Sequence, residues 1–108
     1  MSDYSDKQRR EVWEKAKVVI DYDKDKYRQD LAGAWIEWSK YGDKTSSLGW
    51  NVDHLKPLSQ NGADNISNWV PLQWENNIKK AQKYPEFETA VSSEGNKNIL
   101  KVQSWKCQ

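Results

Sequence analysis

The scarcity of aliphatic side chains is the feature that most limits how this chain can fold. Leu, Ile, Val and Phe together make up 19 of 108 residues, close to the roughly 20% below which a highly charged chain is expected to be disordered. The formal net charge is only +1, however, and the sequence contains seven Trp and five Tyr. Because a large aromatic side chain buries about 150–250 Å², the sequence predicts one globular domain with a tryptophan-rich core.

The composition also disfavours several classes of protein. The near-neutral charge gives no overall basic field of the kind found in many nucleic-acid-binding domains. Cys107 is the single cysteine, which excludes an internal disulfide framework and a structural zinc site built from cysteines. The N-terminal residues lack the pattern of a signal peptide, and no run approaches the ~20 apolar residues of a membrane span. We therefore expect a cytoplasmic protein with no membrane partner.

Periodicity predicts three elements in the first two thirds of the chain. Over residues 5–20, apolar side chains recur at the spacing of one helical face, after a possible cap at Ser5 or Asp6. Residues 34–41 carry aromatic and β-branched side chains before a turn, which favours a strand. Residues 50–55 alternate in the same way, which predicts a second strand, and the polar residues 59–65 after it are typical of a loop.

Three further elements are predicted after that loop. A helix is expected to start at residue 68 or 71 and to run to about residue 82. A proline at the first helical position favours a short helix over residues 85–91. Residues 98–105 contain apolar residues that favour a terminal strand. The mixture predicts an α+β fold in a single domain of residues 1–108.

The only histidine, His54, directly follows Asp53 at the end of a predicted strand. Neighbouring side chains on a strand point to opposite faces, so the two groups are expected to serve different roles. A carboxylate is an oxygen ligand suited to Mg²⁺, and a neutral imidazole with a pKa of about 6.5 can take a proton from water. The pair is therefore suited to holding a metal ion and activating a nucleophile.

Four features follow one another in a characteristic order. The Asp53-His54 pair precedes a glycine-containing loop, Asn68 comes 14 residues after the histidine, and Asn77, with Lys80 three residues beyond it, comes nine residues later. This order resembles the HNH endonuclease family of small bacterial and phage proteins, with weaker similarity reaching back to about residue 26. The segments that carry the resemblance are residues 49–57, 62–68 and 72–80.

The resemblance implies a ββα-metal core of the HNH, or His-Me finger, type over about residues 34–83. An N-terminal helix at about 5–20 would precede this core, and a C-terminal extension of short helix and strand, residues 84–108, would follow it. The first strand of a hairpin would end in the Asp-His pair, a loop would carry the middle asparagine, and a helix would supply the last ligand. The predicted order of strand, loop and helix agrees with this arrangement.

The resemblance also implies roles for individual residues. Asp53 and Asn77 would be metal ligands, His54 the general base, and Asn68 the residue that fixes the loop and orients the histidine. Asn76 is the alternative ligand if the register is shifted by one. Many family members have histidine at the position of Asn77, and an asparagine there makes the ligand set all oxygen, which favours Mg²⁺, or alternatively Mn²⁺. No structural zinc is expected.

The function implied is a metal-dependent HNH endonuclease that nicks or cuts DNA. Two alternatives stay open: a non-catalytic ββα module that binds DNA or protein, for example in phage packaging or as an inhibitor, and a nuclease toxin domain with an immunity partner. A homodimer also stays open. Each site residue has a structural alternative, such as a loop-bridging asparagine or a solvated charge run. The expected contacts to DNA phosphates are Lys56, Lys79, Lys80 and Lys83.

Overall fold

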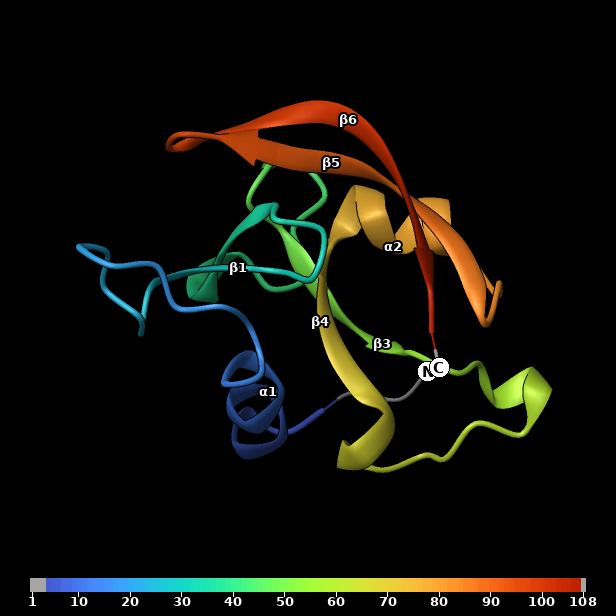
Figure 1. Ribbon diagram of the computed structural model, residues 1–108. Coiled ribbons are helices and arrows are strands. Elements are labelled where there is room, and N and C mark those ends of the chain that lie inside the picture. Colours follow the sequence, from blue (N-terminus) through green and yellow to red (C-terminus); the bar gives the residue numbers. More distant parts are fainter. Residues whose placement is uncertain (1–3, 108) are drawn as a thin grey trace.

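A computed structural model describes residues 4–107 as an α+β fold in which each of three sheets has two antiparallel strands (Figure 1). Within these residues, no helix has the length and apolar character needed to cross a membrane. The helices and strands are α1 (Asp6–Trp13), β1 (Tyr27–Gln29), β2 (Trp35–Glu37), β3 (Trp50–His54), β4 (Trp69–Gln73), α2 (Trp74–Lys80), β5 (Glu86–Glu94) and β6 (Lys97–Lys106), with 3-10 turns at Trp38–Lys40, Leu58–Gln60 and Ile66–Asn68.

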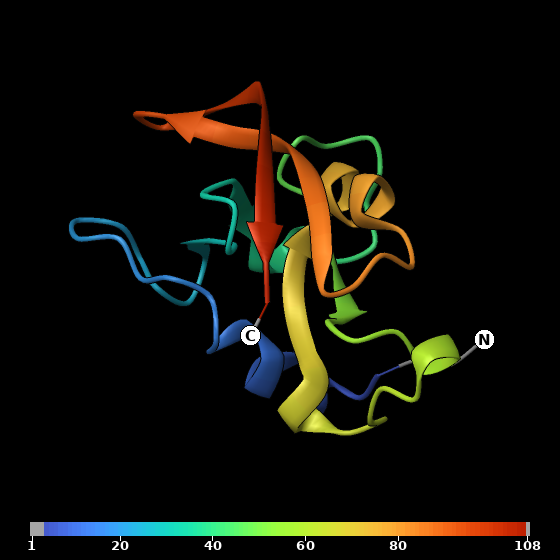
Figure 2. The ribbon, with the colours of Figure 1, turned by 45° about the vertical axis from the view of Figure 1, so that its right-hand side comes forward.

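Strands β3 and β4 pair in register, with Trp50 opposite Gln73 and His54 opposite Trp69. Helix α2 starts directly after β4, where the Gln73 side chain accepts hydrogen bonds from two backbone N–H groups of the first helical turn. These contacts satisfy donors that a helix start otherwise leaves unpaired. Figure 2 shows that α2 lies beside the β3–β4 pair. The strand predicted at residues 50–55 is confirmed, and it leads into a strand–strand–helix order.

The N-terminal helix is shorter than its periodicity predicts. Ser5, one of the two caps that the sequence offers, starts the helix and forms a reciprocal capping box with Gln8, but α1 ends at Trp13 instead of residue 20. Beyond the helix, Lys17 exchanges two backbone hydrogen bonds with Gln29, of 2.8 and 3.0 Å. The prediction is therefore wrong after Trp13, because pairing with a distant segment holds the chain in an extended conformation.

Two other helical predictions are also wrong in part. Residues 69–73 form β4, because they pair with β3 instead of starting a helix, and α2 ends at Lys80 instead of residue 82. The helix predicted at 85–91 is part of strand β5, in which Phe87, Thr89 and Val91 are buried on one face. The alternation of burial along β5 has the period of a strand. A proline just before the first residue of a strand is equally well tolerated.

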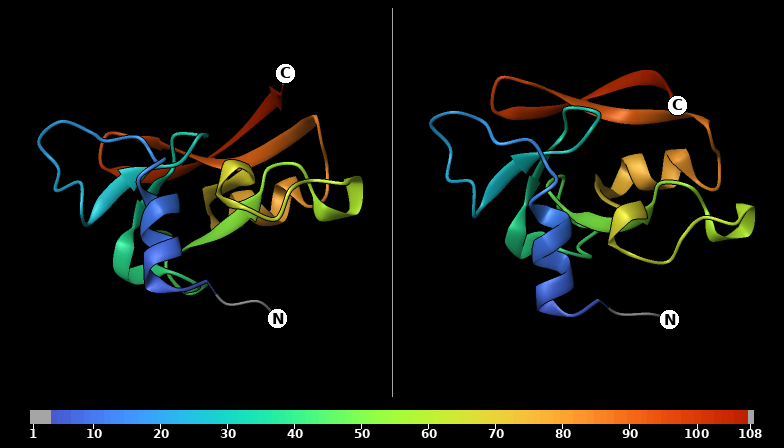
Figure 3. Two further views of the ribbon diagram at one scale, coloured as in Figure 1. Left: turned by 90° about the horizontal axis from the view of Figure 1, so that it is seen from below. Right: turned by 60° about the horizontal axis from the view of Figure 1, so that its bottom comes forward.

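The strands predicted at residues 34–41 and 98–105 agree better with the structure than the helical predictions do. The prediction for residues 98–105 is confirmed by β6, which spans Lys97–Lys106. The strand predicted over 34–41 exists only as β2, because the chain turns into a 3-10 helix at Trp38–Lys40. The β5–β6 hairpin arches over α2, while α1 packs on the other side of β4 (Figure 3).

Tryptophan dominates the core, as the composition predicts. Trp13 and Trp50 are completely buried, with ring centroids 5.3 Å apart, and Trp38 lies 5.8 Å from each of them. Such tilted and edge-to-face contacts are the favourable geometries for aromatic pairs. Ile36 and Trp69 belong to the same buried cluster. This cluster joins α1 to the β3–β4 pair and so supports the strand that carries Asp53 and His54.

A buried polar network, which the sequence did not suggest, holds α2 in place. The Asp30 carboxylate accepts hydrogen bonds from the Gln73 N–H at 2.9 Å and from the Asn76 side chain at 3.0 Å. The Asn76 carbonyl oxygen accepts from the N–H groups of Ala90 and Val91 in β5. Burial raises the pKa of Asp30, although its hydrogen bonds oppose that rise. The network ties α2 to the β1–β2 loop and to β5.

Candidate active site

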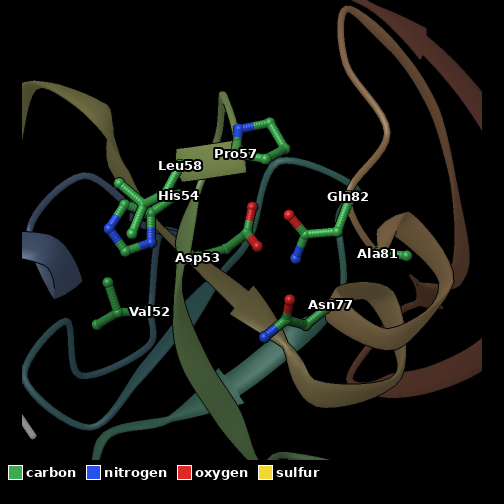
Figure 4. A pocket seen from close by; sticks show the side chains of 8 residues that line it. All are labelled: Val52, Asp53, His54, Pro57, Leu58, Asn77, Ala81 and Gln82. Carbon is green, nitrogen blue, oxygen red and sulfur yellow. The ribbon is translucent and has the colours of Figure 1, made fainter. Parts of the chain in front are cut away.

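A pocket of about 270 Å³ opens where the end of β3 faces the last turn of α2 (Figure 4). In Figure 4 the side chains of Asp53, Asn77 and Gln82 extend toward the same space, while the His54 ring lies on the other side of the strand. Alternation along β3 places these neighbours on opposite faces, as the sequence predicts. The residues that line the pocket are Val52, Asp53, His54, Pro57, Leu58, Asn77, Ala81 and Gln82.

Asp53 is almost fully buried and lies beside Lys80. Its side chain is 11% exposed, and its Oδ2 lies 3.0 Å from the Nζ of Lys80. Lys80 is completely buried, and its Nζ also donates to the backbone oxygen of His54 at 3.3 Å. Desolvation raises the pKa of Asp53, and the positive charge of Lys80 opposes that rise. Despite the close ionic contact, no donor within the described residues is aligned on Asp53 Oδ2 as a hydrogen bond.

The burial of Lys80 corrects the sequence prediction that this lysine contacts DNA. A side chain without exposed surface cannot reach a phosphate, and its ammonium group already faces Asp53. The sequence gave no local sign of this, because Lys79 and Lys80 are adjacent in a charge run that looks like a solvated face. Lys80 is therefore the charge partner of Asp53, a role that sequence reasoning missed.

His54 has partners on a single ring nitrogen. Its Nε2 lies 2.8 Å from an Oδ1 of Asp64 and 3.2 Å from the indole nitrogen of Trp69. The hydrogen bond with His54 is the main reason that the pKa of Asp64 is lowered. Sequence reasoning missed Asp64, which lies ten residues after the histidine, inside the polar loop between β3 and β4.

The side chain of Asn68 holds that loop in shape by hydrogen bonds to the loop backbone. Its side chain donates to the backbone oxygens of Lys56 and Ala63, both at 2.8 Å, and accepts from the Lys56 N–H at 2.9 Å. The loop turns tightly here: Gly62 lies so close to the Lys56 backbone that a Cβ on Gly62 would be 1.8 Å from the Lys56 oxygen. Asn68 therefore acts on the shape of the loop, as the resemblance implies, and it contacts neither the His54 ring nor the pocket lining through any of these bonds.

The adjacent residues Asn77 and Asn76 have different environments in the structure. Asn77 lines the pocket, whereas Asn76 is completely buried and fully engaged with Asp30 and β5. The alternative register, with Asn76 as a ligand, is thereby excluded. Gln82 also lines the pocket, just beyond the end of α2, and was not singled out in the sequence. Its position is held by a 2.7 Å hydrogen bond from Gln60 to its backbone oxygen.

The remaining candidate lysines lie at or near the surface. Lys83 is exposed, and Lys56 is half-buried. Lys79 is 43% exposed and forms an ion pair of 3.7 Å with Glu88. Such an exposed pair is worth little, because solvent and salt screen it. These three side chains can approach a phosphate without rearrangement of the core.

The donors in the pocket fit a hard divalent cation. Asp53 supplies a buried carboxylate whose Oδ2 faces the Lys80 ammonium group, which leaves Oδ1 for a cation, and Asn77 supplies a neutral carbonyl oxygen. Within residues 4–107 there is no cluster of three or more His, Cys, Asp or Glu side chains that could enclose a metal. Mg²⁺ is usually held by one or two protein oxygens, and water and substrate phosphate complete its shell. The residues present fit that pattern.

Comparison with known proteins agrees with the geometry. Residues 37–83 match the HNH endonuclease family, a span that contains Asp53, His54, Asn68 and Asn77. The matched residues are similar to an HNH domain. HNH proteins are generally nucleases that use a divalent metal ion, so a nuclease-type function and a nucleic-acid substrate are indicated for this domain. No curated protein and no solved structure matches the chain.

Proposed function

We propose that this HNH protein is a metal-dependent endonuclease that hydrolyses DNA phosphodiester bonds. The observation that carries the proposal is the pocket shared by Asp53, His54 and Asn77 at the junction of β3 and α2. In this proposal β3, β4 and α2 are the ββα-metal core. The strand pairing and the helix that follows directly support it, since they bring residues 23 and 24 positions apart to one pocket.

His54 is the proposed general base. Its imidazole takes a proton from a water molecule, and the resulting hydroxide oxygen forms the new bond to phosphorus while the bond to the 3′-oxygen breaks. Asp53 and Asn77 would hold Mg²⁺, which stabilises negative charge on the phosphate and the leaving oxygen. The leaving oxygen then takes a proton from solvent. Asn68 maintains the loop through its bonds to Lys56 and Ala63.

Lys80 has a different role in this proposal from the exposed lysines. Its charge favours the ionised form of Asp53, against the desolvation that raises the pKa of this carboxyl, but it also repels a second cation nearby. We therefore expect the divalent ion to bind weakly without substrate and more tightly when a phosphate adds negative charge. Lys56, Lys79 and Lys83 are the proposed phosphate contacts. With a net charge of +1, binding to DNA should be modest and weakened by salt.

Plasmid cleavage tests the proposal directly. The purified chain is incubated with supercoiled plasmid and Mg²⁺ or Mn²⁺, with EDTA as the control. We expect nicked or linear product only with the metal, and His54→Ala should lower the rate by about 10²–10⁴-fold, the usual contribution of a general base. Because the His54 side chain is 19% exposed and is not one of the tryptophan-core residues, although its ring contacts Trp69, the variant should keep its circular dichroism spectrum.

Two results would contradict the proposal at different points. Cleavage that requires metal but survives His54→Ala would refute the assignment of the base. Binding of DNA without cleavage in either metal would refute the nuclease activity and favour the non-catalytic module. Asp53→Asn and Asn77→Ala should each abolish most of the metal-dependent activity, whereas Lys101→Met, an exposed change on β6, should change it little.

A further inference from the structure

Asp64 lies beside the His54 ring from a position that the HNH match does not assign a role. We propose that Asp64 is a positioning residue that holds His54 in the tautomer with the proton on Nε2, so that Nδ1 is the nitrogen that accepts a proton from water. The catalytic consequence rests on the proposed nuclease function, whereas the tautomer itself does not.

The distances around Nε2 decide between the two tautomers. Asp64 Oδ1 lies 2.8 Å from Nε2, and a bare nitrogen at that distance would set its lone pair against the carboxylate. Asp64 is 67% exposed and its pKa is lowered, so it is ionised at neutral pH and cannot itself supply the proton. Nε2 must therefore carry hydrogen and donate it to Asp64.

The second neighbour of Nε2 competes for the same nitrogen. The indole N–H of Trp69 points at Nε2 with the two nitrogens 3.2 Å apart, a contact that suits an Nε2 without hydrogen. The contact of Nε2 with Asp64 is shorter, at 2.8 Å, and involves a charged acceptor. Such hydrogen bonds are roughly twice as strong as neutral ones, so the Asp64 contact decides the tautomer. Within residues 4–107, Nδ1 has no hydrogen-bond partner, which leaves it available to water.

The loop is built so that Asp64 keeps this place. The residue before it, Ala63, is held through its backbone oxygen by the Asn68 side chain at 2.8 Å. Gly62 permits the close approach of the loop to the Lys56 backbone. Asn68 therefore acts on His54 indirectly: it fixes the loop that carries Asp64, and Asp64 contacts the ring.

The chemical consequence follows from the position of the proton. When Nδ1 takes a proton from water, the ring becomes a cation whose Nε2–H already faces a carboxylate, so no group has to reorient at that moment. Removing Asp64 leaves the Trp69 indole N–H as the polar neighbour of Nε2. That donor can be satisfied only by an Nε2 without hydrogen, which favours the opposite tautomer and occupies Nδ1 with the proton.

Nitrogen NMR tests the tautomer without reference to activity. His54 is the only histidine in the chain, so a long-range ¹H–¹⁵N correlation spectrum of the labelled protein contains a single imidazole. The spectrum is recorded at an alkaline pH at which the ring resonances no longer change with pH, so that the neutral ring is observed. We expect Nδ1 to be the unprotonated nitrogen in the wild type and the Nδ1–H form to increase in Asp64→Ala. Plasmid cleavage by Asp64→Ala should have a kcat lower by about 10-fold, with KM little changed.

A matched control is available in Asp25. Its side chain is 70% exposed, similar to the 67% of Asp64, and its nearest charge partner is Arg10 at 3.8 Å. Asp25→Ala removes the same charge and should leave the imidazole spectrum unchanged. A wild-type ring with hydrogen on Nδ1, or an Asp64→Ala spectrum identical to that of the wild type, would overturn the proposal. If the wild type does not cleave DNA, the nuclease proposal fails while the spectrum still decides the role of Asp64.

Discussion

Replacing Lys80 by methionine should destabilise the protein more than any other change of a charged residue on α2. Lys80 is completely buried, with its Nζ 3.0 Å from Asp53 Oδ2, 3.3 Å from the His54 backbone oxygen and 5.3 Å from the centre of the Phe87 ring. Methionine keeps most of the apolar volume and removes the charge. The loss therefore reports the electrostatic contact and not a cavity.

The magnitude follows from what remains after the substitution. Breaking a buried ion pair by removing one partner costs about 3–5 kcal/mol, because the other charge stays buried without compensation. Asp53 retains 11% exposure of its side chain and can take up a proton, so we expect the lower end, about 3 kcal/mol. Against a total stability of about 5–15 kcal/mol this is a large fraction. The urea midpoint should fall by roughly 1–3 M for an m-value of 1–3 kcal/mol/M.

The effect should depend on pH with a definite sign. Desolvation raises the pKa of Asp53 above its usual value, so the folded state holds this proton more tightly than the unfolded state and ionisation of Asp53 opposes folding. Without Lys80 the pKa rises further. The difference in unfolding free energy between the wild type and Lys80→Met should therefore be largest at neutral pH and shrink as the pH falls through the raised pKa of Asp53.

Urea unfolding followed by tryptophan fluorescence measures this difference, and two variants control it. Lys79→Met changes the neighbouring residue, whose exposed pair with Glu88 spans 3.7 Å, and should shift stability by less than about 0.5 kcal/mol. Asp53→Asn combined with Lys80→Met removes both charges and should recover much of the loss. Equal stability of Lys80→Met and Lys79→Met, or a loss that grows at low pH, would refute the reasoning.

Three further predictions concern α2 and the loop. Asn76→Ala leaves two N–H groups of β5 without their acceptor and removes one of the two donors to Asp30 Oδ2, so unfolding free energy should fall by about 3 kcal/mol or more, measured by urea unfolding. Asn77→Ala should leave stability within about 0.5 kcal/mol but reduce Mn²⁺ binding by electron paramagnetic resonance, and unchanged binding would contradict its role as a ligand. Gly62→Ala places a Cβ 1.8 Å from the Lys56 backbone oxygen, so cleavage activity should drop sharply. Gly95→Ala has open space around it but a φ of 60°, so it should lower stability and keep activity.

The candidate site could be predicted from the sequence largely because its parts are local. Asp53 and His54 are neighbours on one strand, and the alternation of a strand already places them on opposite faces. Asn77 lies on a helix that the sequence predicts, although this helix starts at Trp74 instead of residue 68 or 71. Asn68 bonds to a backbone 12 positions away, within the same loop.

The errors in secondary structure share one cause. The patterns of residues 14–20 and 86–91 are compatible with a helix. In the structure, however, both segments form backbone hydrogen bonds with a distant segment of the chain. Lys17 pairs with Gln29, and β5 pairs with β6 while its buried face covers α2. Local propensity is a weak preference of a few tenths of a kcal/mol per residue, and such pairing overrides it.

The sequence by itself determined that the core is built from tryptophan and that an Asp-His pair, a braced loop and a following asparagine come in the order of an HNH domain. Only the tertiary structure decided that Lys80 is buried against Asp53, that Asp64 contacts the His54 ring, and that Asn76 belongs to a structural network. The physical reason is that burial and partner choice depend on which distant segments meet. A lysine in a charge run and an aspartate in a polar loop acquire a role only when the fold supplies the group that they face.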